Sequence, residues 1–148
     1  MDPVTCHILD TTIGKPATNV TVQLFYIAPF LSFAEDDRAY ELPYNNEPFA
    51  MSKTDADGRI KNWTINPSFT SAQKARIGIT SSWSELKPGI YKCMFLTGSY
   101  FHRQGDTVAP RTFFPYVEIT FEIGNPPDSH YHIPLLLSNH SFTTYRGS

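Results

Sequence analysis

Histidines on two segments far apart in the sequence are the residues best suited to acid–base chemistry. His7 lies in the alternating stretch 4–10 and His132 lies in the alternating stretch 131–137, each opposite the face that carries the apolar residues. Because side chains alternate along a strand, both imidazoles are expected to point away from the core. Histidine exchanges protons near neutral pH, so two converging imidazoles would activate a water molecule and shuttle its proton.

Two further segments carry polar groups that could belong to the same site. Arg59 follows the turn sequence Asp-Ala-Asp-Gly at 55–58, where an arginine taken alone is more often a solvated residue flanking the turn. The alternative is a binding role, because a guanidinium binds planar anionic oxygens in a bidentate way and keeps its charge when partly buried. The sequence closes on Tyr-Arg-Gly-Ser, a dense group of side chains able to form specific contacts, whereas chain ends are usually poorly ordered. We therefore expect a tail that folds back onto a site, with Gly147 letting the backbone approach closely. Three tail residues are expected to bind substrate: Tyr145, Arg146 and Ser148.

The second histidine of the later segment, His130, has two interpretations. It shares a face with His132, two residues away, and a position at the rim of the site is the interpretation we favour. Histidines at i and i+2 of a strand, together with His7, could also ligate zinc. The sequence offers no obvious carboxylate to support such ligands, so we expect no functional metal. We expect no cofactor either, because activation of a water by imidazoles needs only a positioned water and charge stabilisation.

Three motifs, in this order, resemble those of one protein family. Cys-His-Ile-Leu-Asp-Thr-Thr-Ile-Gly-Lys-Pro-Ala at 6–17 is similar to the family's N-terminal motif, and Asp-Gly-Arg at 57–59 is similar to its central motif. His-Tyr-His-Ile-Pro-Leu-Leu-Leu-Ser at 130–138, followed by the final Tyr-Arg-Gly-Ser, is similar to its C-terminal signature. The family is that of the 5-hydroxyisourate hydrolases, the transthyretin-like enzymes of purine catabolism.

The resemblance implies an enzyme of urate degradation that hydrolyses 5-hydroxyisourate, a flat anionic heterocycle, to 2-oxo-4-hydroxy-4-carboxy-5-ureidoimidazoline. We expect His7 and His132 to polarise the attacking water, and His7 also to contact the substrate. Arg59 would hold the anionic oxygens of the substrate and stabilise charge at the attacked carbonyl. The resemblance further implies a homotetramer, built as a dimer of dimers with a central channel.

A second hypothesis is a transthyretin-like carrier of a small hydrophobic ligand without catalysis, because one fold can serve both functions. A carrier channel needs none of His7, Arg59, His132 or the terminal Tyr-Arg-Gly-Ser, so their presence favours the enzyme. The sequence departs from the family at Asn139, where a proline is usual, and at Phe142, where a tyrosine is usual. Neither departure touches the proposed reacting groups.

Composition excludes several other classes of protein. The 148 residues suffice for a single domain over 1–148, and the formal net charge is −2 with no basic run. Neither nucleic acid nor an anionic membrane surface is therefore expected as a partner, and no apolar run approaches the roughly 20 residues of a membrane span. The first residues lack a secretory signal, which favours reduced cysteines and a cytoplasmic location. The peroxisome stays open, although no terminal Ser-Lys-Leu signal is present.

The hydrophobic pattern predicts short strands separated by turns. Strands are expected over seven stretches: 4–10, 20–27, 49–54, 59–61, 90–97, 116–123 and 131–137. This pattern predicts an all-β fold, a two-sheet antiparallel β-sandwich, and the resemblance adds the transthyretin form with one short helix at 99–103. Two irregular stretches, 28–47 and 67–88, are interpreted as loop insertions, the second with a weak helix signal at 71–77.

Overall fold

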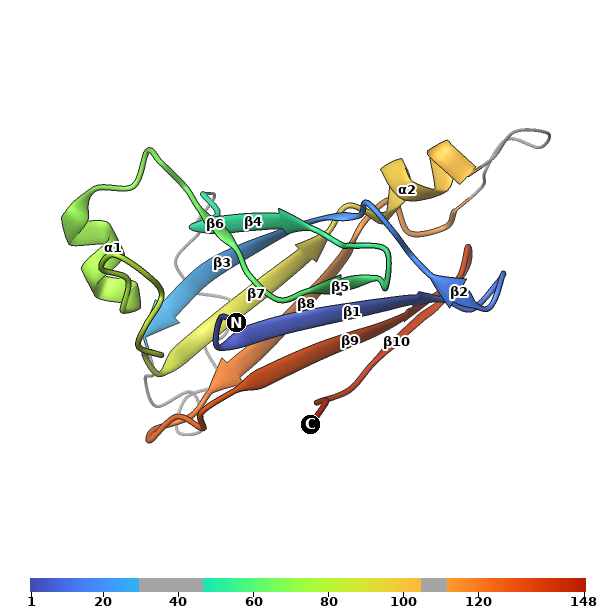
Figure 1. The fold of residues 1–148 in the computed structure, drawn as a ribbon. Helices are drawn as coiled ribbons and strands as arrows, with labels where there is room; N and C mark the ends of the chain where they lie inside the picture. The colour runs from blue at the N-terminus through green and yellow to red at the C-terminus, as the bar shows by residue number, and fades with distance from the viewer. Residues whose placement is uncertain (30–46, 105–111) are drawn as a thin grey trace.

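The computed structural model describes residues 1–29, 47–104 and 112–148, which form two β-sheets packed face to face with a helix near each end (Figure 1). The first sheet contains, in spatial order, β10 (Phe142–Thr144), β9 (Tyr131–Leu137), β1 (Val4–Asp10) and β2 (Lys15–Pro16), and β5 (Arg59–Ile60) also pairs with β1. The second sheet contains, in spatial order, β6 (Thr64–Ile65), β4 (Ala50–Lys53), β3 (Thr21–Pro29), β7 (Gly89–Phe95) and β8 (Val117–Ile123). The helices are α1 (Ser71–Ile77) and α2 (Thr97–Gln104). The predicted sandwich is confirmed.

One strand pair differs from the antiparallel prediction. β1 and β9 run parallel in continuous register, from Val4 beside Tyr131 to Asp10 beside Leu137, whereas the other strand pairs among the described residues are antiparallel. A tight hairpin forces two strands to be antiparallel, but parallel neighbours need a long crossover between them. Here most of the chain lies between the end of β1 and the start of β9 and forms that crossover. No local turn therefore sets the relative direction of the two strands.

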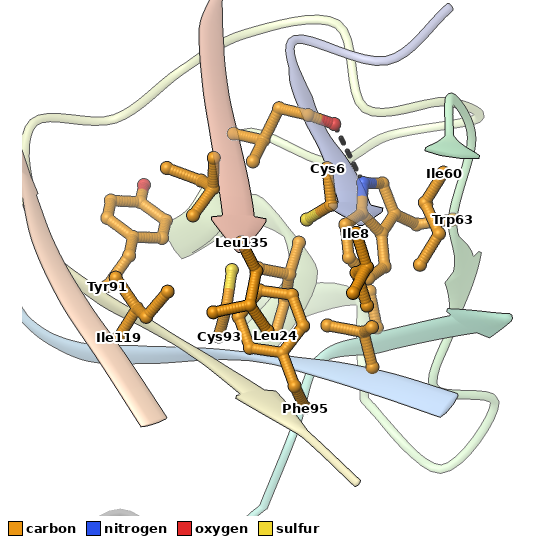
Figure 2. Close-up of a cluster of buried hydrophobic side chains, with 14 of the residues drawn as sticks. Cys6, Ile8, Leu24, Ile60, Trp63, Tyr91, Cys93, Phe95, Ile119 and Leu135 are labelled. Carbon is orange, nitrogen blue, oxygen red and sulfur yellow. Dashed lines mark hydrogen bonds between the residues drawn. The ribbon is translucent and has the colours of Figure 1, made fainter. Parts of the chain in front are cut away.

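The predicted apolar faces of β1 and β9 form the core with the second sheet (Figure 2). Val4, Cys6 and Ile8 of β1 are fully buried, as is Leu135 of β9. Fully burying a side chain of this size contributes about 1.5–3 kcal/mol relative to leaving it exposed. Trp63 fills the space beside β1, and its indole Nε1 donates a 2.8 Å hydrogen bond to the Val4 carbonyl oxygen. Burial of one face therefore fixes which side chains of β1 point outward.

The structure contains two helices in its described part, where the sequence interpretation expected one. The predicted family helix at 99–103 is α2. The weak signal at 71–77 is also a helix, because Thr70 and Gln73 form a reciprocal capping box at its start and Gly78 ends it in a left-handed conformation. The stretch 67–88 is therefore partly regular, and its status as an insertion stays a prediction. Most of the other proposed insertion, 28–47, lies outside the described residues.

A buried carboxylate ties α2 to the end of β1. Asp10 is only 3% exposed, and its Oδ2 accepts a 2.7 Å hydrogen bond from the Tyr100 hydroxyl of α2. Its Oδ1 accepts a hydrogen bond from the Thr12 backbone N–H. The buried carboxylate is thus satisfied at both oxygens, as buried polar groups require. Across the described part of the chain, no helix has the length and apolar character needed to cross a membrane.

The predicted tight turn at 55–58 places Arg59 at the start of β5. The Gly58 N–H donates to the Asp55 carbonyl oxygen, and the Asp55 side chain accepts from the backbone N–H groups of Asp57 and Arg59. These backbone donors lower the pKa of Asp55, that of Arg59 most strongly. Gly58 has φ +73°, and a Cβ there would lie 2.5 Å from the Ile8 carbonyl oxygen. The turn and β1 therefore approach each other at a distance that only glycine allows.

We expect Gly58→Ala to lower the free energy of unfolding more than Gly14→Ala does. Gly14 also has a positive φ, +68°, but a Cβ added there would have no atom within 4 Å. Both variants should lose about 1–2 kcal/mol through the left-handed backbone, and Gly58→Ala should lose about 1–3 kcal/mol more through the clash with β1. Urea unfolding at one fixed protein concentration measures both. Equal losses would mean that the close approach at Gly58 has no energetic consequence.

Candidate active site

Three neighbouring strands of the first sheet bring the predicted reacting groups together. β1 lies between β9 and β5, with Thr5 beside His132 on one side and His7 beside Arg59 on the other. These side chains share the outward face of the sheet, because the alternate residues of β1 and β9 are in the core. The structure therefore places His7, Arg59 and His132 on one surface, although they come from the start, middle and end of the chain.

A pocket of about 210 Å³ opens on this face. Its lining combines the tail with residues of β1, β5 and β9 and of the segments flanking them: Met1, Thr5, Cys6, Arg59, Ile60, Lys61, His130, His132 and Ser148. Of the predicted site residues, Arg59, His132 and Ser148 line it directly. His7 is not part of this lining but lies beside Arg59 across the strand pair. The pocket therefore brings a cation, imidazoles and a hydroxyl to one concave surface.

Thr5 occupies the centre of this arrangement, although the sequence interpretation did not single it out. Its Oγ1 is hydrogen-bonded to His132 Nδ1 at 2.7 Å and to His130 Nε2 at 2.9 Å. The residue is 4% exposed, so its hydroxyl has little access to solvent. Within the described structure, its hydrogen-bond partners are these two imidazoles. One signal in the sequence points to it, since Thr5 is two residues before His7 and shares its face of β1. His130, expected at the rim, therefore belongs to the pocket.

Burial and positive charge keep the two predicted catalytic histidines in their uncharged form. The pKa of His132 is lowered first by desolvation, then by the positive charge of Arg59, and then by the charge that His7 or His130 carries when protonated. The pKa of His7 is lowered by desolvation and by Arg59, with opposing contributions from the Asp57 carbonyl and from the carboxylates of Asp55 and Asp57. Both imidazoles are therefore able to accept a proton at neutral pH.

The tail folds back onto β9, as predicted. The Gly147 N–H donates a 2.9 Å hydrogen bond to the His132 carbonyl oxygen, and these two residues form an isolated antiparallel bridge. A Cβ at position 147 would lie 2.5 Å from His132 Cδ2. Glycine is therefore needed for the tail to pass over the imidazole, and this passage carries Ser148 to the pocket.

Two other tail residues predicted to bind substrate lie elsewhere in the protomer. The Arg146 guanidinium forms an ion pair of 2.7 Å with Asp128 and lies 4.7 Å above the ring centre of Tyr131. Tyr145 is 59% exposed, and neither residue lines the pocket. Arg146 lies outside the pocket of this protomer because Asp128 and the Tyr131 ring hold its guanidinium on the outer surface, beside the start of β9.

The zinc arrangement considered from the sequence has no geometric support in the described residues. In residues 1–29, 47–104 and 112–148, no three or more His, Cys, Asp or Glu side chains are grouped to hold a metal ion. His130 Nε2 and His132 Nδ1 are instead both directed at the Thr5 hydroxyl. The two cysteines are buried and unbridged, and desolvation followed by contact with Cys6 raises the pKa of the Cys93 thiol. Neither is therefore an activated nucleophile.

Comparison with known proteins assigns the chain to a family. Residues 4–147 match the model of the HIUase/Transthyretin family. The chain belongs to this family. It is 35% identical over 146 residues to a probable 5-hydroxyisourate hydrolase of Schizosaccharomyces pombe, an alignment that covers 98% of this chain and 90% of the relative. The family resemblance stated from three short motifs is thus confirmed over nearly the full length.

The solved structures with a similar fold include a 5-hydroxyisourate hydrolase and a transthyretin. The 5-hydroxyisourate hydrolase of Klebsiella pneumoniae is 28% identical with a TM-score of 0.62, and the match covers 98% of each chain. Transthyretin from Sparus aurata is 25% identical with a TM-score of 0.64, and the match covers 99% of this chain and 97% of that one. Because the two scores are so close, the backbone alone does not separate a 5-hydroxyisourate hydrolase from a transthyretin.

We expect His7 and His132 to titrate below the ordinary histidine pKa of 6.5. A lowered pKa keeps the base form down to lower pH, so the acid limb of kcat/KM should also fall below pH 6.5. In Arg59→Gln, both pKa values should rise toward 6.5 without reaching it, because desolvation is the larger cause. Proton NMR of the imidazole Cε1–H signals measures this directly in the free protein.

Lys61→Gln is the matched control for this titration. Lys61 lines the same pocket two residues after Arg59, but it is not among the causes that lower either histidine pKa. Its replacement should therefore leave both titration curves in place. Equal shifts in the two variants would contradict the assignment of the electrostatic effect to Arg59.

Proposed function

We propose that this chain hydrolyses 5-hydroxyisourate to 2-oxo-4-hydroxy-4-carboxy-5-ureidoimidazoline in urate degradation. The observation that carries the proposal is the shared outward face on which Arg59, His7 and His132 meet beside a pocket. The hydrolase names of the relatives support the same substrate. The substrate is flat, anionic and rich in oxygen, which suits a guanidinium opposite imidazole bases.

In the proposed reaction, an imidazole removes a proton from water as the water oxygen attacks a ring carbonyl. His132 lines the pocket and His7 lies beside Arg59, so the two imidazoles can take part in activating the water and returning its proton to the departing ring nitrogen. Arg59 holds the anionic oxygens of the substrate and stabilises the charge that develops on the attacked carbonyl. The steps need a positioned water and fixed positive charge, and we propose no cofactor or metal.

The direct test follows freshly generated 5-hydroxyisourate by ultraviolet absorbance with and without the protein. We expect the wild type to accelerate its decay, and His7→Ala and His132→Ala each to slow turnover by about 10²–10⁴-fold, the usual cost of losing a general base. Circular dichroism should report an unchanged fold, since both side chains lie opposite the core. Wild-type turnover in either single variant would contradict the role of that histidine, and an inactive wild type would contradict the function.

A transthyretin-like carrier is the second candidate, because the backbone is as similar to a transthyretin as to a hydrolase. The pocket does not favour an apolar ligand, since its lining includes Arg59, Lys61 and two histidines. Binding of a small hydrophobic ligand without acceleration of 5-hydroxyisourate decay would favour the carrier. The cytoplasmic location stays a prediction that imaging of a fluorescent fusion would check.

We also propose that the active form is a homotetramer with sites between subunits. The pocket lies on an outward sheet face rather than within the sandwich, so a second surface would be needed to exclude water from it. Tyr145 is largely exposed in the protomer, which leaves its hydroxyl available to a site completed by a neighbouring copy. Closed symmetric assemblies are the common form of soluble oligomers.

Deleting the four tail residues 145–148 should remove most activity while leaving the melting temperature and assembly nearly unchanged. The tail is exposed or half-buried throughout, but it carries Ser148 to the pocket and crosses His132 through Gly147. Kinetics, thermal melting and light scattering on one preparation measure the three effects. Arg146→Gln removes the ion pair with Asp128 without shortening the tail, so it separates the contribution of Arg146 from that of Gly147 and Ser148. A truncated protein that melts far lower would instead make the tail a structural clasp.

A further inference from the structure

The two hydrogen bonds of Thr5 join His132 and His130 through a single hydroxyl. Thr5 Oγ1 lies 2.7 Å from His132 Nδ1 and 2.9 Å from His130 Nε2. A hydroxyl has one proton to donate and can accept others. If Thr5 accepted from both neutral imidazoles, its own hydroxyl proton would be left buried with no partner among the described residues. Donating to one histidine and accepting from the other avoids this, which leaves two proton arrangements.

The role of His132 as a base selects one of these arrangements. Because Nδ1 is bound to Thr5, Nε2 is the nitrogen of His132 left to meet a water in the pocket. An imidazole whose Nε2 accepts a proton must carry its own proton on Nδ1. His132 Nδ1–H then donates to Thr5, and the Thr5 hydroxyl donates to His130 Nε2.

We propose that Thr5 is a positioning residue that holds His132 in the base tautomer and connects it to His130 as a proton acceptor. This inference rests on the proposed hydrolysis and adds to it a residue and a route for the proton. It concerns Thr5 and His130, whose hydroxyl and imidazole are otherwise unused by the proposed reaction.

The proton transfers balance along this route. As His132 Nε2 takes a proton from water, its Nδ1 proton passes to Thr5 Oγ1, and the original Thr5 proton passes to His130 Nε2. The hydroxide oxygen bonds to the carbonyl carbon, His132 is left neutral with its proton on Nε2, and His130 becomes the imidazolium. When the ring C–N bond breaks, His132 Nε2 gives its proton to the nitrogen and the other two transfers reverse.

The positive groups around His132 favour a route in which His132 itself does not become charged. Arg59 from β5 and His7 from β1 face His132, and His130 lies just before its own strand. A second positive charge on His132 beside the Arg59 guanidinium would be costly in a partly buried site. Passing the proton through Thr5 leaves His132 neutral, so the guanidinium stabilises the substrate oxyanion without opposing an imidazolium.

The test combines a structural readout with kinetics on four variants. Thr5→Val removes the hydroxyl, Thr5→Ser keeps it, and His130→Gln keeps hydrogen-bonding groups but cannot take up a proton at neutral pH. Thr144→Val is the matched control, since the Thr144 hydroxyl also bonds β9, at the Pro134 carbonyl, but lies outside the pocket. Nitrogen-15 NMR of the imidazoles reports which ring nitrogen of His132 carries the proton, whether or not the protein turns over.

We expect wild-type His132 to be protonated at Nδ1 and not at Nε2, and Thr5→Val to lose this preference. Thr5→Val and His130→Gln should each lower kcat by roughly 10–100-fold with little change in KM, and the double variant should be no slower than the slower single variant. Thr5→Ser should restore kcat, and Thr144→Val should match the wild type in both measurements.

Several results would overturn the proposal. A His132 protonated at Nε2 in the wild type would reverse the hydrogen bonds at Thr5. Full turnover in His130→Gln would reduce Thr5 to holding the ring, and a Thr5→Ser as slow as Thr5→Val would deny a role for the hydroxyl. A wild type with the expected tautomer but no hydrolysis would instead contradict the proposed function while retaining the hydrogen-bonded chain.

Discussion

The parallel pairing of β1 with β9 is the constraint on which the site depends. Its register places Thr5 beside His132 and keeps the outward faces of both strands continuous. A slip of one residue would turn His132 toward the core and Ile133 toward solvent. Burial of Ile8 and Leu135, each 0% exposed, opposes such a slip. The chemistry of one face is therefore positioned by the hydrophobic effect acting on the other.

The same alternation explains how much could be predicted from the sequence. Strand faces depend on neighbouring residues, so the outward directions of His7 and His132 followed from the apolar residues beside them. The turn before Arg59 was also local, because Asp55 supplies its hydrogen-bond acceptors. Strand direction was not local, because the chain between β1 and β9 is long enough to allow either orientation. The prediction of a wholly antiparallel sandwich failed at that pair.

Side-chain partners across strands were the other part that the sequence could not supply. Thr5 was visible as a residue on the His7 face, but its bonds to two histidines depend on the β1–β9 register. Arg146 was chosen for its charge, but its ion pair with Asp128, on the segment before β9, could not be predicted from the sequence. Such contacts arise from tertiary packing, whereas residue type alone indicates only which chemistry is available.

The separation of β1 from β9 also sets the order in which a ribosome can make this protein. All five strands of the second sheet precede β9 in the chain, so that sheet can be paired while the centre of the first sheet still lacks a neighbour. Thr5 emerges 127 residues before His132. Until β9 follows, the edge of β1 that will receive it presents unpaired backbone groups to other chains. The scaffold is therefore largely translated before the histidine pair can exist, and the newly made chain is most exposed to misassociation just before its site can form.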